Sequence, residues 1–410
     1  MAEVAGGLRA AGTRPGDIVT WQSPNRDEVA VAYRACWRVG AVAAPLHHQA
    51  GAADAARMRA ILRPRLEIDV AALPSGEPVT TVWPEPDTRA AVLFTSGSSG
   101  APKGVVHTQA SLAYKAVQMR DAHGLGPADC VLMPAPAAHI SGLLNGVTLP
   151  GVVPFRTVFM ARWDPDTALA LIARERVTFM VGPPTFFVSM MRAPSFDPAR
   201  VESLRLISSG GAGVSDAFIA EATRAFGARV KRTYGSTEAP SIISDGRAIG
   251  PVRCRVDAQG ELQVRGEELF AGYLDDDQTR AAFTDDGWFR TGDLAAVASD
   301  GTITITGRLK DVIIRGGENI STGEVEATLE AHPDVRHAVA LGEPDDRLGE
   351  RVVAIVEAPA TFGLDACRAW FAERGVAKFK TPERVVALDA MPLLASGKPD
   401  KEALRALIAD

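Results

Sequence analysis

The chain has 410 residues and a formal net charge of −6 at pH 7; 46% of its residues are hydrophobic and 23% are charged. This is the composition of an ordinary globular protein, with a length that suggests two or three domains. The mild acidity gives no electrostatic basis for binding nucleic acid or an anionic membrane. The four cysteines form no CxxC pair, so a reducing compartment is expected.

The sequence shows no segment that is typical of a membrane or secretory protein. Its N-terminus, MAEVAGGLRAAG, lacks a cationic start followed by an apolar run, so no signal peptide is expected. The most apolar stretch, residues 140–155, contains Asn145, Pro150 and Pro154 and is shorter than the ~20 apolar residues that span a bilayer. We therefore expect a soluble, cytoplasmic protein without a membrane span.

Short apolar runs alternate with amphipathic segments over roughly the first three hundred residues, a pattern that predicts strands and helices in turn. Such alternation is typical of an α/β fold of parallel sheets with helices on both faces, in which ligands bind beyond the carboxyl ends of the strands. The expected strands are 17–21, 91–94, 130–133, 179–181 and 204–207, and the expected helices are 28–39, 111–121, 165–176 and 215–226.

The pattern changes near residue 260, where two segments alternate with the period of half-buried strands. We predict a large N-terminal domain of layered sheets and helices over residues 1–309 and a small, mobile α+β domain over residues 310–410. The elements expected from here on are strands at 261–264, 302–306, 312–314, 335–341 and 352–356 and helices at 323–331 and 364–374.

The segment Thr95–Gly104, TSGSSGAPKG, follows a predicted buried strand. Its glycines let the backbone turn N–H groups inward, and its hydroxyls and Lys103 add donors for a polyanion. It is not a Walker A loop, because Lys103 is followed by Gly104 rather than by serine or threonine. The sequence favours a phosphate-binding loop, with a flexible surface loop as the structural alternative.

Six further motifs follow this loop in order: SSGGAG at 208–213, YGSTE at 234–238, TGD at 291–293, GRLKD at 307–311, RGGENIS at 315–321 and SGK at 396–398. Together they resemble the acyl-adenylate-forming superfamily, which includes acyl-CoA synthetases, peptide-synthetase adenylation domains and luciferases. The resemblance covers nearly the whole chain. The chain is shorter than most relatives and is trimmed around residues 50–90 and 241–260, which weakens inferences about substrate and assembly.

The resemblance implies where ATP and AMP bind. The Tyr234 ring would stack on adenine, the Asp293 carboxylate would accept hydrogen bonds from the ribose hydroxyls, and Arg308 would reinforce that contact. The structural alternatives are the end of a strand for Tyr234, a turn cap for Asp293 and a solvated side chain for Arg308. The implied nucleotide-binding residues are Thr95, Ser96, Gly97, Ser98, Ser99, Gly100, Lys103, Gly210, Gly211, Ala212, Tyr234, Gly235, Ser236, Asp293 and Arg308.

The resemblance also implies the catalytic residues. Lys398 would be the adenylation lysine, because an ammonium offsets the repulsion between carboxylate and α-phosphate; the alternative is a solvated lysine. Thr237 and Glu238 would contact phosphate, with Glu238 holding Mg²⁺. His139, in PAPAAHISG, would line the carboxylate site or be a packed core residue.

The resemblance assigns three further residues to the step in which the acyl group is transferred to CoA. Lys310 would be the hinge about which the small domain turns. The structural alternative is an exposed linker lysine, which is compatible with that role. Gly316 and Gly317 would line the channel for CoA, although Gly-Gly pairs are usually ordinary turns.

The function that the resemblance implies is an AMP-forming carboxylate–CoA ligase that uses ATP, Mg²⁺ and CoA. The acid stays open among medium-chain, alicyclic and aryl carboxylates, and fatty acid metabolism is the expected setting. One alternative is an adenylating enzyme that loads a carrier-protein thiol; another is a non-catalytic acyl or nucleotide sensor. The oligomeric state is left open, with a homodimer among the possibilities.

Overall fold

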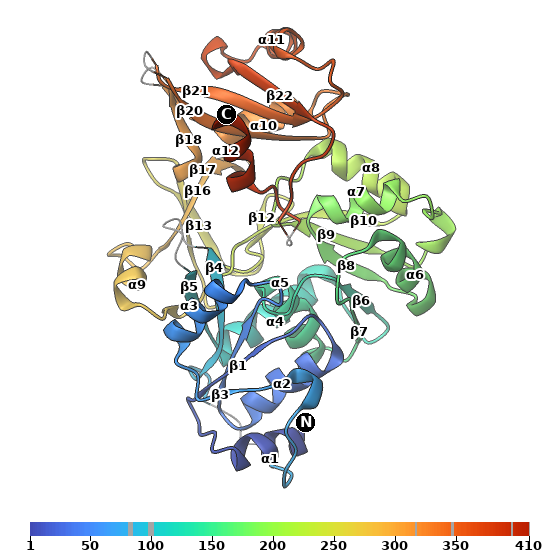
Figure 1. Ribbon diagram of the computed structural model, residues 1–410, viewed down its shortest axis with the longest axis vertical. Coiled ribbons are helices and arrows are strands. Elements are labelled where there is room, and N and C mark those ends of the chain that lie inside the picture. The colour runs from blue at the N-terminus through green and yellow to red at the C-terminus, as the bar shows by residue number, and fades with distance from the viewer. Residues whose placement is uncertain (81–84, 97–101, 316–317, 346–347, 395–396, 410) are drawn as a thin grey trace. The chain divides into compact units, whose positions relative to one another are not determined.

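The computed structural model describes residues 1–80, 85–96, 102–315, 318–345, 348–394 and 397–409. Two compact units emerge from the chain: the first comprises 1–211, 222–253 and 264–289, and the second comprises 212–221, 254–263 and 290–410. Among the described residues, no helix is long and apolar enough to cross a membrane. Figure 1 labels the elements of both units.

The first unit contains a six-stranded sheet in the order β15-β5-β4-β2-β1-β3. Strands β1 to β4 run parallel, whereas β5 pairs antiparallel with both β4 and β15. Helices α1 and α2 pack on this sheet through a core that includes Leu8, Tyr33 and Trp21. The bounds are β1 Ile18–Gln22, β2 Val42–Leu46, β3 Leu66–Glu67, β4 Arg89–Ser96, β5 Pro102–Thr108, β15 Gly272–Tyr273, α1 Ala2–Ala10, α2 Asp27–Arg38, α3 Ala52–Leu62, α9 Asp276–Ala282 and the short 3₁₀ turn η1 Val70–Ala72.

A seven-stranded sheet in the order β12-β11-β10-β9-β8-β6-β7 forms the second layer of this unit. Helix α4 lies between the two sheets, because Leu112 packs into the core of the first sheet while Ala116 and Met119 pack into that of the second. The bounds are α4 Gln109–His123, β6 Cys130–Met133, α5 Ile140–Gly142, η2 Leu143–Thr148, η3 Leu149–Gly151, β7 Arg156–Phe159, α6 Pro165–Glu175, β8 Phe179–Gly182, α7 Pro184–Arg192, η4 Pro198–Arg200, β9 Leu206–Gly210, α8 Asp216–Phe226, β10 Arg229–Tyr234, β11 Ile243–Ser244 and β12 Arg247–Ala248.

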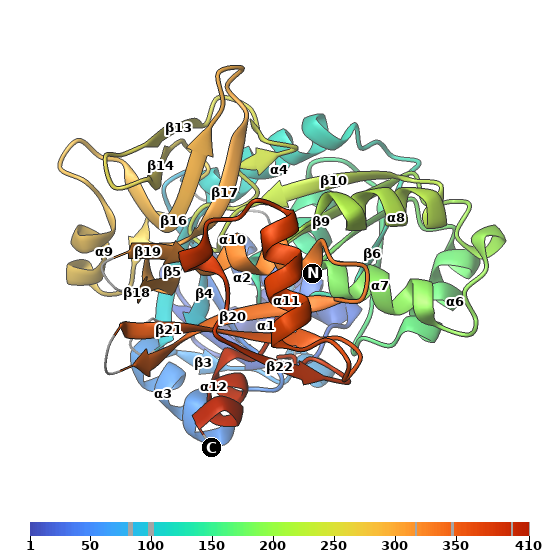
Figure 2. The same cartoon turned by 90° about the horizontal axis from the view of Figure 1, so that it is seen from above.

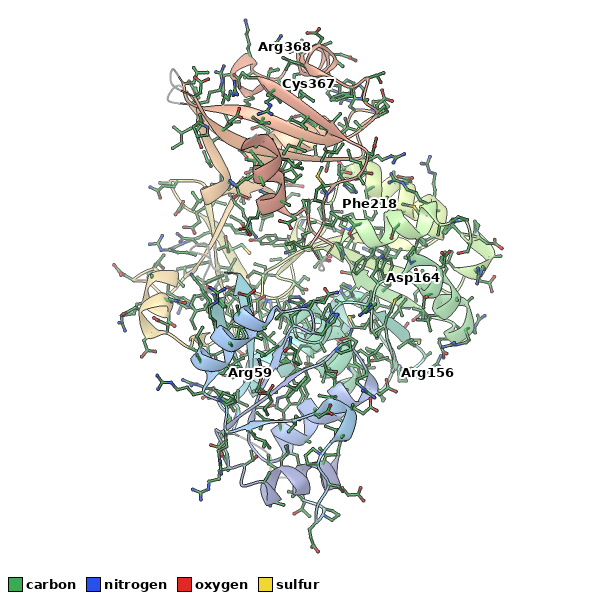
Figure 3. All side chains as sticks on the ribbon, viewed as in Figure 1. Arg59, Arg156, Asp164, Phe218, Cys367 and Arg368 are labelled. Carbon is green, nitrogen blue, oxygen red and sulfur yellow. The ribbon has the colours of Figure 1, made fainter. Side chains whose placement is uncertain are left out.

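The second unit contains a five-stranded sheet, with β19, β18, β21 and β20 in order and β22 paired to β21. Alternate residues of β20 and β21 face opposite helices: Ala340 packs with α10 and α11, and Leu341 packs with α12. Figure 2 shows these helices around the sheet. Cys367 of α11 is fully buried, whereas the neighbouring Arg368 is exposed (Figure 3).

A further four-stranded sheet, β13-β14-β16-β17, lies mostly in the second unit. Its last two strands carry Asp293 and Arg308. The bounds of this sheet and of the five-stranded sheet with its helices are β13 Arg253–Val256, β14 Glu261–Arg265, β16 Phe289–Val297, β17 Ile303–Arg308, η5 Leu309–Asp311, β18 Val312–Arg315, β19 Glu318–Ser321, α10 Thr322–Glu330, β20 His337–Asp345, β21 Gly349–Glu357, α11 Leu364–Glu373, η6 Lys378–Lys380, β22 Arg384–Leu388 and α12 Lys401–Ala409.

The α/β fold class with layered sheets is confirmed, but the expectation of parallel sheets is wrong at their edges. Strands β5, β15, β11 and β12 run antiparallel to their neighbours. The reason for β5 is geometric: only residues 97–101 separate it from β4, and a parallel pair needs a crossover of a dozen residues or more. The division of the domains at residue 309 stays a prediction.

Candidate active site

The first predicted motif is a hairpin rather than a loop between strand and helix. Strand β4 ends at Ser96 and β5 begins at Pro102, and Thr95 is the register partner of Lys103. The five described residues of the segment predicted as a ten-residue loop, 95–96 and 102–104, therefore all lie in strands. Gly97, Ser98, Ser99 and Gly100 lie outside the described residues, as do any contacts they make.

Lys103, Tyr273 and Glu238 form a chain of contacts in the first unit. The Tyr273 hydroxyl donates a hydrogen bond to Glu238 Oε1 at 2.9 Å. The Lys103 ammonium lies 5.1 Å from the centre of the Tyr273 ring, within the range of a cation–π interaction. Burial, followed by the negative charge and hydrogen bond of Glu238, raises the pKa of Tyr273 well above its usual range. The hydroxyl therefore stays protonated and keeps donating to the carboxylate.

The YGSTE segment is a closed turn. Ser236 N donates to the Ala239 carbonyl at 3.0 Å, and Ala239 N donates to Ser236 Oγ at 3.1 Å. A Cβ added at Gly235 would lie 2.2 Å from Ser241 N, so this position requires glycine. The fold therefore fixes the direction of the two residues that follow, Thr237 and Glu238.

The backbone of this turn is anchored on two further elements. His107 of β5, fully buried, contacts the Thr237 carbonyl through Nε2 at 2.8 Å. Phe270 N donates to the Glu238 carbonyl at 2.8 Å. Burial lowers the pKa of His107 to about 4, so at neutral pH the ring is uncharged and Nε2 carries the proton that it donates.

The glycine-rich turn after β9 packs against the strand that ends at Tyr234. Ser208 Oγ and Thr233 Oγ1 are 2.7 Å apart, and a Cβ at Gly210 would lie 2.1 Å from the Thr233 carbonyl oxygen. Gly211 adopts φ +78°, which favours glycine. The first unit thus holds Gly210, Gly211 and Tyr234, whereas Ala212 belongs to the second unit.

His139 lies in a cluster of three histidines. Its ring centre is 5.0 Å from that of His47, which is 4.7 Å from that of His48. Burial and the His48 charge lower the pKa of His47 to about 4. Of the two expectations for His139, an aromatic packing contact is thus observed, and a role at the carboxylate site stays a prediction.

Asp293 and Arg308 are paired across strands β16 and β17 in the second unit. They are register partners, and Arg308 Nε lies 2.9 Å from Asp293 Oδ1. Asp293 is 5% exposed. Its orientation is set by the TGD turn, in which Asp293 N donates to Thr291 Oγ1 at 3.1 Å and Gly292 adopts φ +71°.

Lys398 interacts electrostatically with this pair. Its carbonyl accepts a hydrogen bond from Leu394 N at 2.7 Å, and Leu393 bridges Pro399. Desolvation and then the Arg308 guanidinium lower the pKa of Lys398, while the Asp293 carboxylate raises it. Three predicted residues that are far apart in the sequence are thus within electrostatic reach of one another.

Of the three residues predicted for the hinge and the CoA channel, the structure describes the position of one. Lys310 lies in the turn η5 Leu309–Asp311, directly after Arg308. Gly316 and Gly317 fall outside the described residues. Their roles in the hinge and the CoA channel stay predictions.

Two residues of the site, Tyr273 and His107, were missed by the sequence analysis. Tyr273 follows RGEELFAG, a segment in which two glycines and one aromatic residue gave no functional signal. His107 lies in an apolar strand, where a single histidine is typical of a packed core residue. Only the folded chain shows that both residues hold the Thr237–Glu238 pair.

The donor set around Glu238 fits a magnesium ion that is bound mainly by phosphates. Mg²⁺ prefers oxygen ligands and usually takes one or two carboxylates, with phosphates and water completing its shell. Glu238 supplies one carboxylate, of which Oε1 accepts from Tyr273. Among the described residues no group of three or more histidine, cysteine, aspartate or glutamate side chains could form an all-protein metal site.

Comparisons with known proteins show which family the chain belongs to. The family described as AMP-binding enzyme matches residues 1–69 and 60–274, and its C-terminal domain matches residues 324–398. The medium-chain fatty-acid–CoA ligase of Escherichia coli is 31% identical, over 98% of this chain and 83% of its own. A feruloyl-CoA synthase of Amycolatopsis is 33% identical, over 97% and 90%.

A solved structure is similar over the same extent. The ATP-bound structure of MatB from Rhodopseudomonas palustris has a TM-score of 0.91 and 28% identity, over 99% of this chain and 92% of its own. Motif order, fold and sequence similarity all lead to one conclusion: the chain belongs to the family of AMP-binding enzymes, within the acyl-adenylate-forming superfamily.

Proposed function

We propose that the protein is an AMP-forming carboxylate–CoA ligase that works in two half-reactions. In the first, a carboxylate oxygen attacks the α-phosphorus of ATP, the bond to the bridging oxygen breaks, and pyrophosphate leaves with that electron pair. In the second, the CoA thiolate attacks the acyl carbon of the acyl-adenylate and AMP leaves. The family membership and the names of the related CoA ligases support this proposal.

The observation that carries the proposal is the convergence of Asp293, Arg308 and Lys398 in the second unit. The Asp293 carboxylate would accept hydrogen bonds from the ribose hydroxyls, with Arg308 fixing its direction from 2.9 Å away. Lys398, cationic beside them, would contact the carboxylate and the α-phosphate as negative charge accumulates between them. Burial removes part of the hydration of this ammonium and thereby lowers the pKa of Lys398.

In the first unit, we assign nucleotide contacts to the hairpin and to the YGSTE turn. Lys103 would neutralise phosphate charge, and Tyr234 would stack on adenine. Glu238, held by Tyr273, would contribute a carboxylate to Mg²⁺, which supplies charge neutralisation to the departing pyrophosphate. The segment 95–100, with Gly210, Gly211, Ala212, Gly235, Ser236 and Thr237, completes the proposed nucleotide site.

CoA is the proposed acceptor, because the segment RLKDVIIRGGENIS at 308–321 resembles the CoA-ligase form of the family. Lys310 would be the hinge and Gly316 and Gly317 the channel. The cytoplasmic location and the oligomeric state stay predictions of the sequence. The related enzymes named above act on medium-chain and feruloyl acids, so the acid is proposed only as a medium-chain, alicyclic or aryl carboxylate.

A panel of acids tests the proposal directly. The enzyme is incubated with ATP, Mg²⁺ and each acid, and pyrophosphate release is followed with and without CoA. We expect at least one acid to give rapid, CoA-dependent turnover with stoichiometric AMP. Release that requires an added carrier protein would favour the carrier-loading alternative, and exchange with no acid of the panel would favour a sensor.

A further inference from the structure

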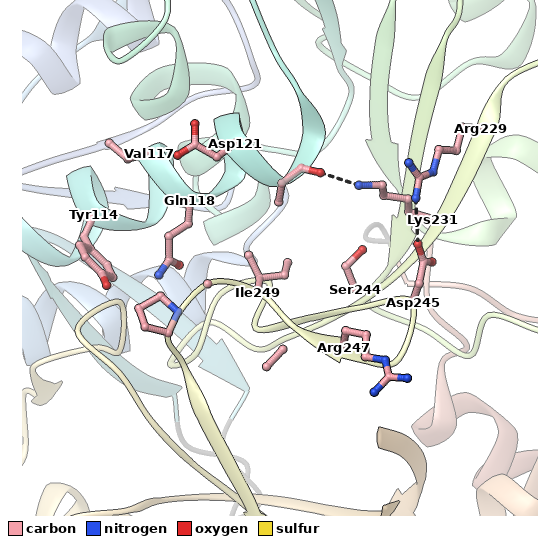
Figure 4. A pocket seen from close by; sticks show the side chains of 14 residues that line it. Tyr114, Val117, Gln118, Asp121, Arg229, Lys231, Ser244, Asp245, Arg247 and Ile249 are labelled. Carbon is pink, nitrogen blue, oxygen red and sulfur yellow. Dashed lines mark hydrogen bonds and ion pairs between the residues drawn. The ribbon is translucent and has the colours of Figure 1, made fainter. Parts of the chain in front are cut away.

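A cavity of about 600 Å³ opens between helix α4 and the strands β10, β11 and β12 of the first unit (Figure 4). None of the motifs described above contributes a residue to it. Its wall on the α4 side includes Val117 and Gln118, and its opposite wall includes Lys231, Ser244 and Ile249. The cavity therefore combines apolar surface with polar and charged side chains.

Lys231 is a buried ammonium without an acidic partner. It is 7% exposed, and it donates one hydrogen bond, to the Ala122 carbonyl at 2.6 Å (Figure 4). Among the described residues it forms no ion pair, although a buried cation is usually paired with a carboxylate. Burial and then the Arg229 guanidinium lower the pKa of Lys231, while Asp245 raises it.

Two neutral groups at the cavity wall also lack partners. Gln118 is 8% exposed, and its Nε2 has no hydrogen-bond partner among the described residues, although its Oε1 accepts from Lys115 at 3.1 Å. The buried Ser244 hydroxyl is likewise unpartnered. Buried donors without a protein acceptor are uncommon in folded proteins, so both groups are available to an acceptor that enters the cavity.

The electrostatic surroundings favour an anion. Next to Ala122 of the cavity wall, burial and then the charges of Lys231, Lys115, Arg205 and Arg229 together lower the pKa of His123 to about 3.

The two carboxylates at the cavity wall do not offset this positive charge. Asp245 accepts from Arg232 N at 2.8 Å and lies 3.9 Å from Arg229, and Asp121 is paired with Arg120 at 2.7 Å. Lys231 therefore forms no direct ion pair with either carboxylate in the part of the chain that the structure describes.

We propose that this cavity is a second ligand site that binds an organic anion, a carboxylate or phosphate on an apolar body. The anionic group is held by the Lys231 ammonium and by the donors of Gln118 and Ser244. The apolar body packs against Val117 and Ile249. A volume of about 600 Å³ is in the range of small-molecule sites and exceeds what an inorganic anion requires.

The position of the site gives it a route to the active site. Strand β10 ends at Tyr234 and β11 begins at Ile243, so the two strands of the cavity wall flank the YGSTE turn on both sides. A ligand that changes the spacing of these strands would change the position of Glu238. Such coupling is reciprocal, so the nucleotide would then alter the affinity of the cavity for its ligand.

Calorimetric titration of the full-length enzyme saturated with AMP tests the proposal. The probes are phenyl phosphate, benzoate, inorganic phosphate and uncharged phenol. We expect phenyl phosphate, benzoate or both to bind at one site that depends on Lys231. Phenol and inorganic phosphate should bind at least about tenfold more weakly. Phenol lacks the charged group, to which a hydrogen bond contributes strongly, and inorganic phosphate lacks the apolar body. Whichever of phenyl phosphate and benzoate binds more tightly shows whether the site prefers a phosphate or a carboxylate.

Two variants show whether this binding occurs in the cavity. Lys231→Met removes the charge and should weaken the binding about tenfold or more. Val117→Trp fills the cavity from α4 while keeping Lys231, so it should also weaken the binding, and retained binding of AMP in both variants shows that the protein is folded. Lys378→Met, at an exposed lysine of the second unit, is the control that should change nothing. The proposal is overturned if neither organic anion binds, or if Lys231→Met and Val117→Trp both bind the anion as tightly as the unsubstituted enzyme does.

Discussion

Tyr273 offers the sharpest test of the active-site geometry, because replacing it by phenylalanine removes a single hydroxyl. That hydroxyl donates to Glu238 Oε1 at 2.9 Å. The Lys103 contact is made by the ring and is retained in the variant. A hydrogen bond to a charged group contributes about 1.5–3 kcal/mol, and about 1.4 kcal/mol corresponds to a factor of ten in rate. We therefore expect Tyr273→Phe to lower kcat/KM for MgATP by about 10- to 150-fold.

Carboxylate-dependent pyrophosphate exchange, measured over a range of Mg²⁺ concentrations, is the assay. The loss should be greatest at low Mg²⁺, because the proposed function of the hydroxyl is to orient a metal ligand. Tyr114→Phe is a matched control: it removes the same atom from a tyrosine of the same unit that makes no described hydrogen bond. This control should retain wild-type exchange.

A double-mutant cycle decides whether the hydroxyl acts through Glu238. If it does, Tyr273→Phe should have little further effect once Glu238 is replaced by alanine, since the two residues then act as one unit. A full, additive loss in the Glu238→Ala background would refute the reasoning. Wild-type activity of the single Tyr273→Phe variant would refute it equally.

Three further predictions address the second unit and the core of the first. Lys398→Ala should abolish carboxylate-dependent pyrophosphate exchange while ATP binding, measured by calorimetry, largely survives; unchanged exchange would exclude the proposed role. Burial raises the pKa of Glu330 to about 7, so the folded state holds a proton that the unfolded chain releases, and stability should fall as pH rises from about 4.5 to 7. Glu330→Gln, which keeps the acceptor for Ala338 N, should therefore stabilise the protein by on the order of 3 kcal/mol at pH 8 and hardly at pH 4, as checked by urea unfolding at both values. Lys115 Nζ lies 3.8 Å from Glu268 Oε1 in the core, with both side chains almost fully buried; Lys115→Met should destabilise the protein by about 3–5 kcal/mol, because it leaves a buried carboxylate without a counter-charge, and Lys115→Met/Glu268→Met should recover most of that loss in the same unfolding assay.

Local patterns predicted most of the elements whose formation depends on neighbouring residues. The strand expected at 130–133 is β6 Cys130–Met133, and the helix expected at 165–176 is α6 Pro165–Glu175. Pro165 at the first helical position and the Asp164 side chain that accepts from Thr167 N explain why this helix begins where it does. Such signals lie within a few residues of the element that they define.

Features that depend on contacts between residues far apart in the chain could not be predicted from the sequence. The direction of β5 depends on which strands lie beside it, and PKGVVHT contains no information about its partners. The contact of Tyr273 with Glu238 joins residues 35 positions apart, and the ion pair of Lys115 with Glu268 joins two charged residues that composition alone would place on the surface. The motifs identified the nucleotide-contacting candidates, but only the folded chain identified the side chains that hold them.

The hairpin of β4 and β5 has a consequence for how the first motif can vary. Seven register pairs, including Thr95 with Lys103, fix the two arms of the hairpin relative to each other. The number of residues between Ser96 and Pro102 can therefore change without displacing Lys103 from Thr95. The paired strands should tolerate replacement of residues 97–101 by the corresponding segment of a related enzyme, whereas a one-residue deletion within β5 would turn Lys103 to the opposite face of the sheet.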